Sequence, residues 1–539
     1  MVRPLFVACA GALLAAATIH SQLSPPRFYP DDPLLRVPPP LPVKTALNRD
    51  IDDLYDFLVD SAHPPGPRQY KPVMIPAGAV NTLGEVPDSD WYTNRWRDRP
   101  MTLEELARGP HENPPPFMGG PWKVTSAKTI GVTPGFAFTD AHGEKYLVKF
   151  DPKSNPEMAT ACDVVGAHFF YAFGYNVPSN YIVVFAKNQL TIAPGAKFTT
   201  PEGRKRLMRL EDVDRILAEV PKTADGRYRG MATAIIHGHL IGPFWYHGTR
   251  RDDPNDIVPH QNRRDLRGLY VFAAWLNHTD AKSGNTLDTI VTEDGIPRIK
   301  HYLIDFGAIM GSDSTEAKAP LSGHEYFIDY KPGAIRALTL GFWVPDWARA
   351  DMKSFPAVGH FSAALFDPDC WKNNYPNPTF LDRLPDDEFW AAKQVMRFTP
   401  SQIRVMVESG EYSNPEVVSY LTRVLIERQQ KIGRVFFAKV LPLDNFTVRG
   451  GRLEFEDLAV KYGFTAPRSF TIDWSRYDNN TRQQAPLNGS TFEVPREAFE
   501  TGARDYFCAR IRGADPAKTV AVYLRGGPAP TVVGIDRSW

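Results

Sequence analysis

The sequence predicts an α+β protein in which a mixed region is followed by a helical region and then by an all-β domain. Three observations support this prediction. Short β-rich runs and one long helical pattern alternate in the first half, helical patterns dominate residues 386–439, and short alternating runs separated by Gly, Asn and Pro follow residue 441. With 539 residues the chain is too long for one hydrophobic core, so two or three domains are expected.

The first residues have the pattern of a secretory signal peptide, which we expect to occupy residues 1–22. Arg3 precedes an uncharged apolar run over residues 5–19, and a polar, proline-containing stretch follows. The run is shorter than the roughly 20 residues that span a bilayer, and no later run reaches that length. We therefore expect an exported protein without an integral membrane span in its mature chain, in the periplasm or at the cell surface. A bacterial envelope is the preferred setting, and an uncleaved anchor is the alternative.

Charge excludes some classes of partner. The 62 basic and 62 acidic residues cancel, and no long block of one sign occurs. A nucleic-acid-binding or polybasic membrane surface needs an excess of positive charge, so nucleic acid is not expected as a partner.

Residues 23–119 are rich in proline, with three consecutive prolines at 38–40 and again at 114–116. Such a segment is typically extended, and we expect it to wrap the domain that follows, with one short helix over residues 50–59.

Residues 120–245 predict a mixed first part of the central domain. A helix is expected from Asn155, as N-cap, to Phe173, because apolar residues recur at helical spacing and Gly174 follows. Residues 189–229 break the pattern and suggest an insertion. Strands are expected over residues 128–132, 136–139, 145–150 and 180–185, and within the strand-rich stretch 231–244.

Residues 246–440 predict a helical second part, and residues 441–539 predict a small β-sandwich. The helices are expected over residues 263–276, 386–397, 400–408 and 415–439. The β-runs include residues 446–448, 452–455, 470–472 and 520–524.

The most informative residues are His278, Asp280 and Asn285, followed by an Asp-Phe-Gly sequence that begins at Asp305. Their order resembles the H-x-D-x-x-x-x-N and D-F-G motifs of protein kinases, with Thr279 in place of the usual arginine. The pattern is also similar to the atypical, HipA-like and CotH-like kinases. The resemblance implies a bilobal protein-kinase-like core over residues 120–440, with lobes 120–245 and 246–440.

The resemblance also implies roles for these residues. Asp280 and His278 would be the catalytic residues, with Asp280 orienting the attacking group in a phosphoryl transfer. Asn285 and Asp305 would hold Mg²⁺ or Mn²⁺ beside ATP. Upstream, Lys149 ends a predicted strand where the phosphate-binding lysine of kinases lies. Glu157, near the start of the next helix, would be its partner; its alternative role is a favourable interaction with the helix dipole.

Two kinase features are missing from the sequence. Gly131 and Gly135 do not form G-x-G-x-x-G, and Pro134 between them removes an amide that could bind phosphate. No A-P-E sequence follows Asp305.

We therefore expect an exported phosphotransferase that moves a phosphoryl group from ATP to a hydroxyl acceptor. A protein, a lipid, a glycan or a small molecule could be that acceptor. The alternative is a catalytically inactive kinase-fold protein that binds at the envelope or surface.

Overall fold

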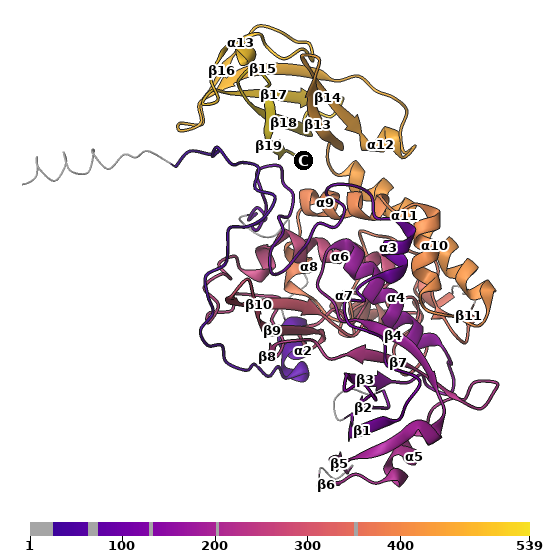
Figure 1. Cartoon of the computed structure of the whole chain (residues 1–539). Helices are drawn as coiled ribbons and strands as arrows, with labels where there is room; N and C mark the ends of the chain where they lie inside the picture. The colour runs from indigo at the N-terminus through magenta and orange to yellow at the C-terminus, as the bar shows by residue number, and fades with distance from the viewer. Residues whose placement is uncertain (1–24, 63–73, 129–132, 201–203, 350–353) are drawn as a thin grey trace, which may run out of the picture. The chain divides into compact units, whose positions relative to one another are not determined.

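A computed structural model describes residues 25–62, 74–128, 133–200, 204–349 and 354–539 (Figure 1). The signal peptide predicted over residues 1–22 lies outside these residues. Contacts divide the chain into a larger unit, residues 35–80 and 86–439, and a smaller unit, residues 25–34, 81–85 and 440–539. The domain boundaries given above stay predictions, but the predicted order of a mixed region, helices and an all-β region is confirmed.

The larger unit begins with a seven-stranded sheet in the order β4-β7-β3-β2-β1-β5-β6. Only the β1–β5 pair is parallel, and the other neighbours are antiparallel. Buried aromatic and aliphatic side chains from most of these strands form one core. The strands are β1 (Trp122–Ala127), β2 (Gly135–Thr139), β3 (Lys145–Lys149), β4 (Asn180–Phe185), β5 (Leu190–Thr199), β6 (Lys205–Leu207) and β7 (Tyr228–Ala234).

Two expectations for this region need correction. The first strand is β1 rather than 128–132, of which residues 129–132 lie outside the described residues. The long helix α4 spans Met158–Phe173, with Glu157 rather than Asn155 at the N-cap position, and the Asn155 side chain donates to the Pro356 carbonyl. Residues 189–229, where the pattern broke, are regular: they supply β5 and β6 at the edge of the sheet and helix α5 (Leu210–Ala218), whose Val213 and Leu217 join the sheet core, and the insertion stays a prediction.

The proline-rich segment contributes helices α2 (Asp53–Ala62) and α3 (Leu103–Arg108), and much of it lies against the larger unit. The indole of Trp96 donates to the Ala172 carbonyl at the end of α4, at 2.8 Å. Trp91 stacks on His301, with 3.5 Å between ring centroids. The segment thus covers both the helix and the small sheet described next.

A second sheet has three strands in the order β10-β9-β8. Along the chain, helix α6 lies between β8 and β9, and further helices follow β10. Its strands are β8 (His239–Leu240), β9 (Thr286–Glu293) and β10 (Ile296–Leu303). The predicted helices 263–276, 386–397, 400–408 and 415–439 are confirmed as α6 (Arg264–Leu276), α9 (Pro385–Met396), α10 (Pro400–Glu408) and α11 (Pro415–Ala438). The remaining elements are α7 (Tyr330–Leu338), α8 (Pro378–Asp382) and the short β11 (Ser354–Phe355) and β12 (Gly359–His360).

The smaller unit contains a hairpin, β13–β14, and a sheet in the order β16-β15-β17-β18-β19. Both contribute apolar side chains to one core, and Phe28 from the amino-terminal segment stacks on Tyr506 at 5.4 Å. Its elements are β13 (Leu443–Arg449), β14 (Arg452–Asp457), α12 (Leu458–Lys461), β15 (Thr471–Tyr477), β16 (Gln484–Pro486), α13 (Glu497–Glu500), β17 (Tyr506–Arg512), β18 (Thr519–Arg525) and β19 (Thr531–Arg537).

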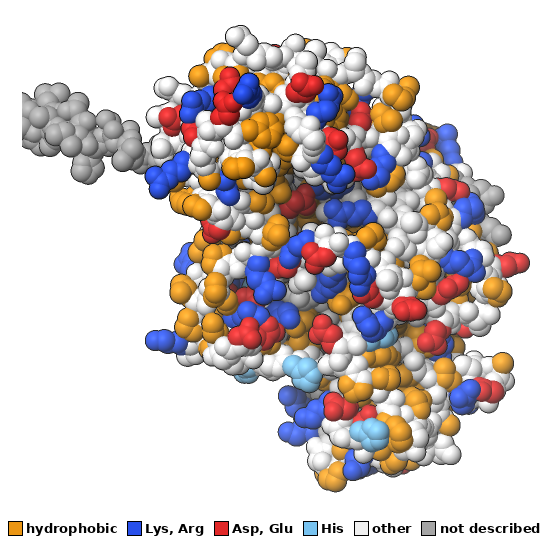
Figure 2. All heavy atoms as spheres, turned by 45° about the horizontal axis from the view of Figure 1, so that its top comes forward, with side chains coloured by type: hydrophobic (Ala, Val, Ile, Leu, Met, Phe, Trp, Pro, Cys, Tyr) orange, Lys and Arg blue, Asp and Glu red, His pale blue; other side chains and the backbone are white. Residues whose placement is uncertain are grey.

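Two surface properties bear on partners. On the face that Figure 2 shows, Lys and Arg side chains are interspersed with Asp and Glu, as the balanced composition suggests. Among the described residues, no helix combines the length and the hydropathy needed to cross a membrane.

Candidate nucleotide and metal site

The β9–β10 hairpin brings the two sequence motifs together. Its strands pair in register from Thr286 opposite Leu303 to Glu293 opposite Ile296, and a turn at Asp294 and Gly295, both with positive φ, closes it. The residues flanking the open end therefore meet: the Ile304 amide donates to the Asn285 carbonyl at 3.0 Å. The nineteen residues between Asn285 and Asp305 thus contain a hairpin that returns the chain to its starting point.

Asp280 and Asn285 form one hydrogen-bonded unit. The Asn285 side-chain amide donates to the Asp280 carboxylate at 2.9 Å and to its main-chain carbonyl at 2.8 Å. Lys282, which the sequence did not point to as a site residue, has its Nζ 3.6 Å from the same carboxylate. Partial burial raises the pKa of Asp280 above its ordinary value, against the opposing effect of Lys282. A raised pKa brings a carboxylate closer to the range in which it exchanges protons near neutral pH.

Lys149 is the centre of a three-residue ion cluster. Its Nζ lies 2.9 Å from Asp305 Oδ1 and 3.2 Å from Asp163 Oδ2. Burial by itself would lower the pKa of Lys149, but the two carboxylates outweigh it, so the pKa lies above its ordinary value. The side chain is therefore a buried, permanent positive charge joined directly to Asp305.

The expected pairing of Lys149 with Glu157 is wrong. Glu157 occupies the N-cap position of α4 with φ 65°, and its carboxylate accepts the Ser413 amide at 3.0 Å. Asp163, a turn and a half further along the helix, accepts a hydrogen bond from Lys149 instead. Asp163 also accepts the Phe306 amide at 2.9 Å. A single carboxylate in the otherwise apolar body of this helix was the signal in the sequence, because a buried charge needs a partner.

His278 packs within the core and takes no part in the hydrogen bonding between Asp280 and Asn285. The residue is 5% exposed, and its ring packs against the stacked pair of Phe170 and Phe306, with centroids 5.7 and 6.0 Å away. Burial, followed by the ammonium of Lys318, lowers the pKa of His278 to about 4. The imidazole is neutral near pH 7, and the catalytic role expected from the sequence stays a prediction.

A lysine from the following segment stands beside the position where the kinase motif has arginine. Lys318 is fully buried and donates to the hydroxyl of Thr279. Its Nζ is also 3.8 Å from Asp313. A positive charge therefore reaches the residue next to Asp280 from 39 positions further along the chain.

Lys128 adds a second ammonium beside Lys149. Its Nζ donates to the carbonyl and hydroxyl of Thr133, at 3.0 and 2.9 Å, and no described carboxylate forms an ion pair with it. A Cβ at Gly135 would lie 3.2 Å from the Lys128 stem and 2.3 Å from the Val148 carbonyl, so this glycine permits the close approach. Burial, followed by repulsion from Lys149, lowers the pKa of Lys128 to about 8.

The oxygen atoms at the site suit a hard divalent cation. Asp305 is 43% exposed on its side chain and uses Oδ1 for Lys149, while Asn285 uses its amide nitrogen for Asp280. One oxygen of each residue is left for a ligand, and Mg²⁺ or Mn²⁺ prefers such oxygens. Within the described ranges no group of three His, Cys, Asp or Glu side chains forms a metal site.

No protein-family model matches the chain. No curated protein matches it by sequence either. Several solved structures are similar in fold, and three of them are kinases.

The Helicobacter pylori proinflammatory kinase CtkA is 13% identical, with 60% of this chain and 98% of that one covered at a TM-score of 0.32. The Golgi casein kinase with Mn/ADP bound is 9% identical, with 63% and 74% covered at a TM-score of 0.30. An alpha kinase from Entamoeba histolytica is 14% identical, with 42% and 81% covered at 0.18. These scores are low, so the roles below rest on the chain's own geometry.

Proposed function

We propose that the chain is a phosphotransferase that moves the γ-phosphoryl group of ATP to a hydroxyl acceptor with the help of Mg²⁺ or Mn²⁺. The observation that carries the proposal is the contact between Lys149 and Asp305 at 2.9 Å, beside the Asp280–Asn285 pair. Strand β3 thus brings a buried ammonium, and the β9–β10 hairpin and the turn before it bring two carboxylates and an amide oxygen, to a single site.

Each side chain has a distinct task in this reaction. Lys149 and Lys128 would bind phosphate oxygens, and Asp163 would hold Lys149 in place. Asp305 and Asn285 would hold the cation, which when bound neutralises charge on the phosphates. The two lysines supply positive charge where the sequence lacks a glycine-rich loop.

Asp280 would orient the acceptor hydroxyl and take its proton. The hydroxyl oxygen forms a bond to the γ-phosphorus, the bond from that phosphorus to the bridging oxygen breaks, and ADP leaves. The proton passes to Asp280 and then to water. The raised pKa of Asp280 supports this assignment.

Export, expected from residues 1–22, remains part of the proposal, and so does the hydroxyl acceptor.

The binding test compares the full chain with Asp305→Ala in thermal unfolding with ATP, with Mn²⁺, and with both. We expect a stabilisation that needs both ligands and is lost in the variant, which should itself unfold within a few degrees of the wild type. No shift at millimolar ligand would instead favour a binding protein without kinase chemistry.

A further inference from the structure

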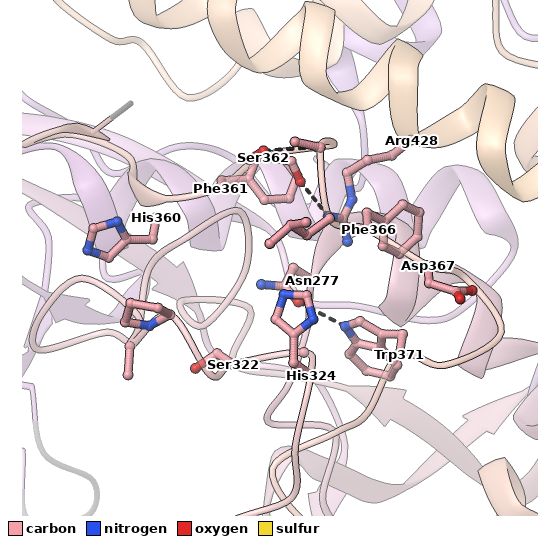
Figure 3. A pocket seen from close by; sticks show the side chains of 15 residues that line it. Asn277, Ser322, His324, His360, Phe361, Ser362, Phe366, Asp367, Trp371 and Arg428 are labelled. Atoms are coloured by element: carbon pink, nitrogen blue, oxygen red, sulfur yellow. Dashed lines mark hydrogen bonds between the residues drawn. The ribbon is translucent and has the colours of Figure 1, made fainter. Parts of the chain in front are cut away.

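A separate cavity of about 50 Å³ lies within the larger unit, between α11 and the segment that follows Asp305. Figure 3 shows Arg428 entering it from α11, with Asn277 and His324 on the opposite side. Its lining also includes His360, Phe361 and Trp371.

Arg428 brings a buried positive charge to this cavity, whose lining also includes the carboxylate of Asp367. The residue is 4% exposed, and its guanidinium donates to the carbonyls of Ala274, Trp275 and Ser362 at 2.6–2.9 Å. Its carbon Cζ lies 3.5 Å from the ring centroid of Phe366. Among the described residues no carboxylate forms an ion pair with it, and burial lowers its pKa.

The surrounding dipoles compensate this charge only in part. Ala274 and Trp275 are in the last turn of α6, where a helix end carries about half a negative charge. An arginine stays protonated in proteins, so a buried guanidinium needs roughly one full negative charge to offset its desolvation.

Two other polar side chains, Asn277 and His360, also line the cavity. Asn277 accepts the Trp371 indole N–H through Oδ1 at 2.8 Å, which leaves its amide hydrogens for another group. The Nδ1 atom of His360 is buried and has no hydrogen-bond partner. Such orphaned polar atoms cost free energy unless a ligand or water satisfies them.

We propose that this pocket binds a free tetrahedral oxyanion of the size of phosphate, held by Arg428, Asn277 and His324. A cavity of 50 Å³ holds about three to five water-sized groups, which matches the five atoms of phosphate or sulfate. The bound anion would join α11, the segment around His324 and the end of α6. Because Asn277 directly precedes His278, the anion would also steady the loop that carries Asp280.

The experiment is thermal unfolding of the full chain in sodium phosphate, compared with sodium chloride at the same ionic strength. We expect a saturable rise in Tm with phosphate alone, of about 3 °C at a hundredfold excess over Kd. His324→Leu and Arg428→Gln should lose the rise. Arg423→Gln, an exposed change on the same helix, should keep it.

Phosphate could also bind at the nucleotide site, and Lys128→Met separates the two sites. The rise should persist in this variant if the anion binds beside Arg428. A rise lost in Lys128→Met, a rise kept in His324→Leu, or no saturable rise in the wild type would each overturn the proposal. If Arg428→Gln fails to fold, His324→Leu decides.

Discussion

Asp163 is the carboxylate that holds Lys149, and replacing it by Asn tests the corrected pairing. The substitution keeps the size of the side chain but removes its charge, 3.2 Å from Lys149 Nζ. The matched control is Glu157→Gln, which makes the same chemical change at the carboxylate that the sequence pattern favoured.

The expected loss of stability follows from the burial of the pair. Breaking a buried ion pair costs about 3–5 kcal/mol, and we expect about 3 kcal/mol because Asp305 still neutralises Lys149. The larger unit has about 400 residues, and an unfolding entropy of about 2.1 cal/mol/K per residue converts this loss into a Tm decrease of about 4 °C. Glu157→Gln, near the surface and bonded to one amide, should change Tm by less than about 1 °C.

The assay is calorimetry of both variants, followed by titration with ATP and Mn²⁺. Asp163→Asn should also weaken nucleotide binding about tenfold, equal to about 1.4 kcal/mol, because Lys149 is no longer held from two sides. Equal effects of the two substitutions, or a larger effect of Glu157→Gln, would refute the assignment of Asp163 as the lysine's partner.

Two further predictions concern packing and pH. Gly166→Ala places a Cβ 2.4 Å from the Cβ of Phe306, so we expect a lower Tm and weaker nucleotide binding despite a helix-propensity gain of about 1 kcal/mol. The control Gly333→Ala, in open space on α7, should raise Tm. If calorimetry finds both variants stabilised, the tight packing of Gly166 against Phe306 is contradicted. ATP affinity should fall by up to about tenfold per pH unit above pH 8, because free Lys128 loses its proton near pH 8 and must regain it to bind phosphate. Titration calorimetry should show that this fall is absent in Lys128→Arg. An equal fall in both proteins would exclude Lys128 as a phosphate-binding residue.

Local sequence patterns were sufficient to predict elements that have a helical apolar repeat or a recognisable motif. The four long helices of the second region were predicted within a few residues, because apolar residues recur at helical spacing and three of the four helices begin with a proline. The Asp-Gly pair at 294–295 between two alternating runs is a hairpin signal that would have explained the spacing of Asn285 and Asp305. That hairpin was readable in the sequence but was not predicted.

Other features depend on contacts between distant parts of the chain. Glu157 and Asp163 are both acidic residues near the start of one helix, and only the orientation of α4 against β3 decides that Asp163 faces Lys149. Lys318 reaches Thr279 across 39 residues, and no local pattern encodes that approach.

By itself, the sequence determined the α+β order of the chain and the identity of Asp280, Asn285, Lys149 and Asp305 as one candidate site, because residue type and spacing are local properties. The tertiary structure alone decided which carboxylate holds the lysine, that His278 packs in the core, and that Asn277 and Arg428 line one pocket. The physical reason is that ion pairing, burial and pKa depend on distances between residues far apart in sequence, which only packing fixes.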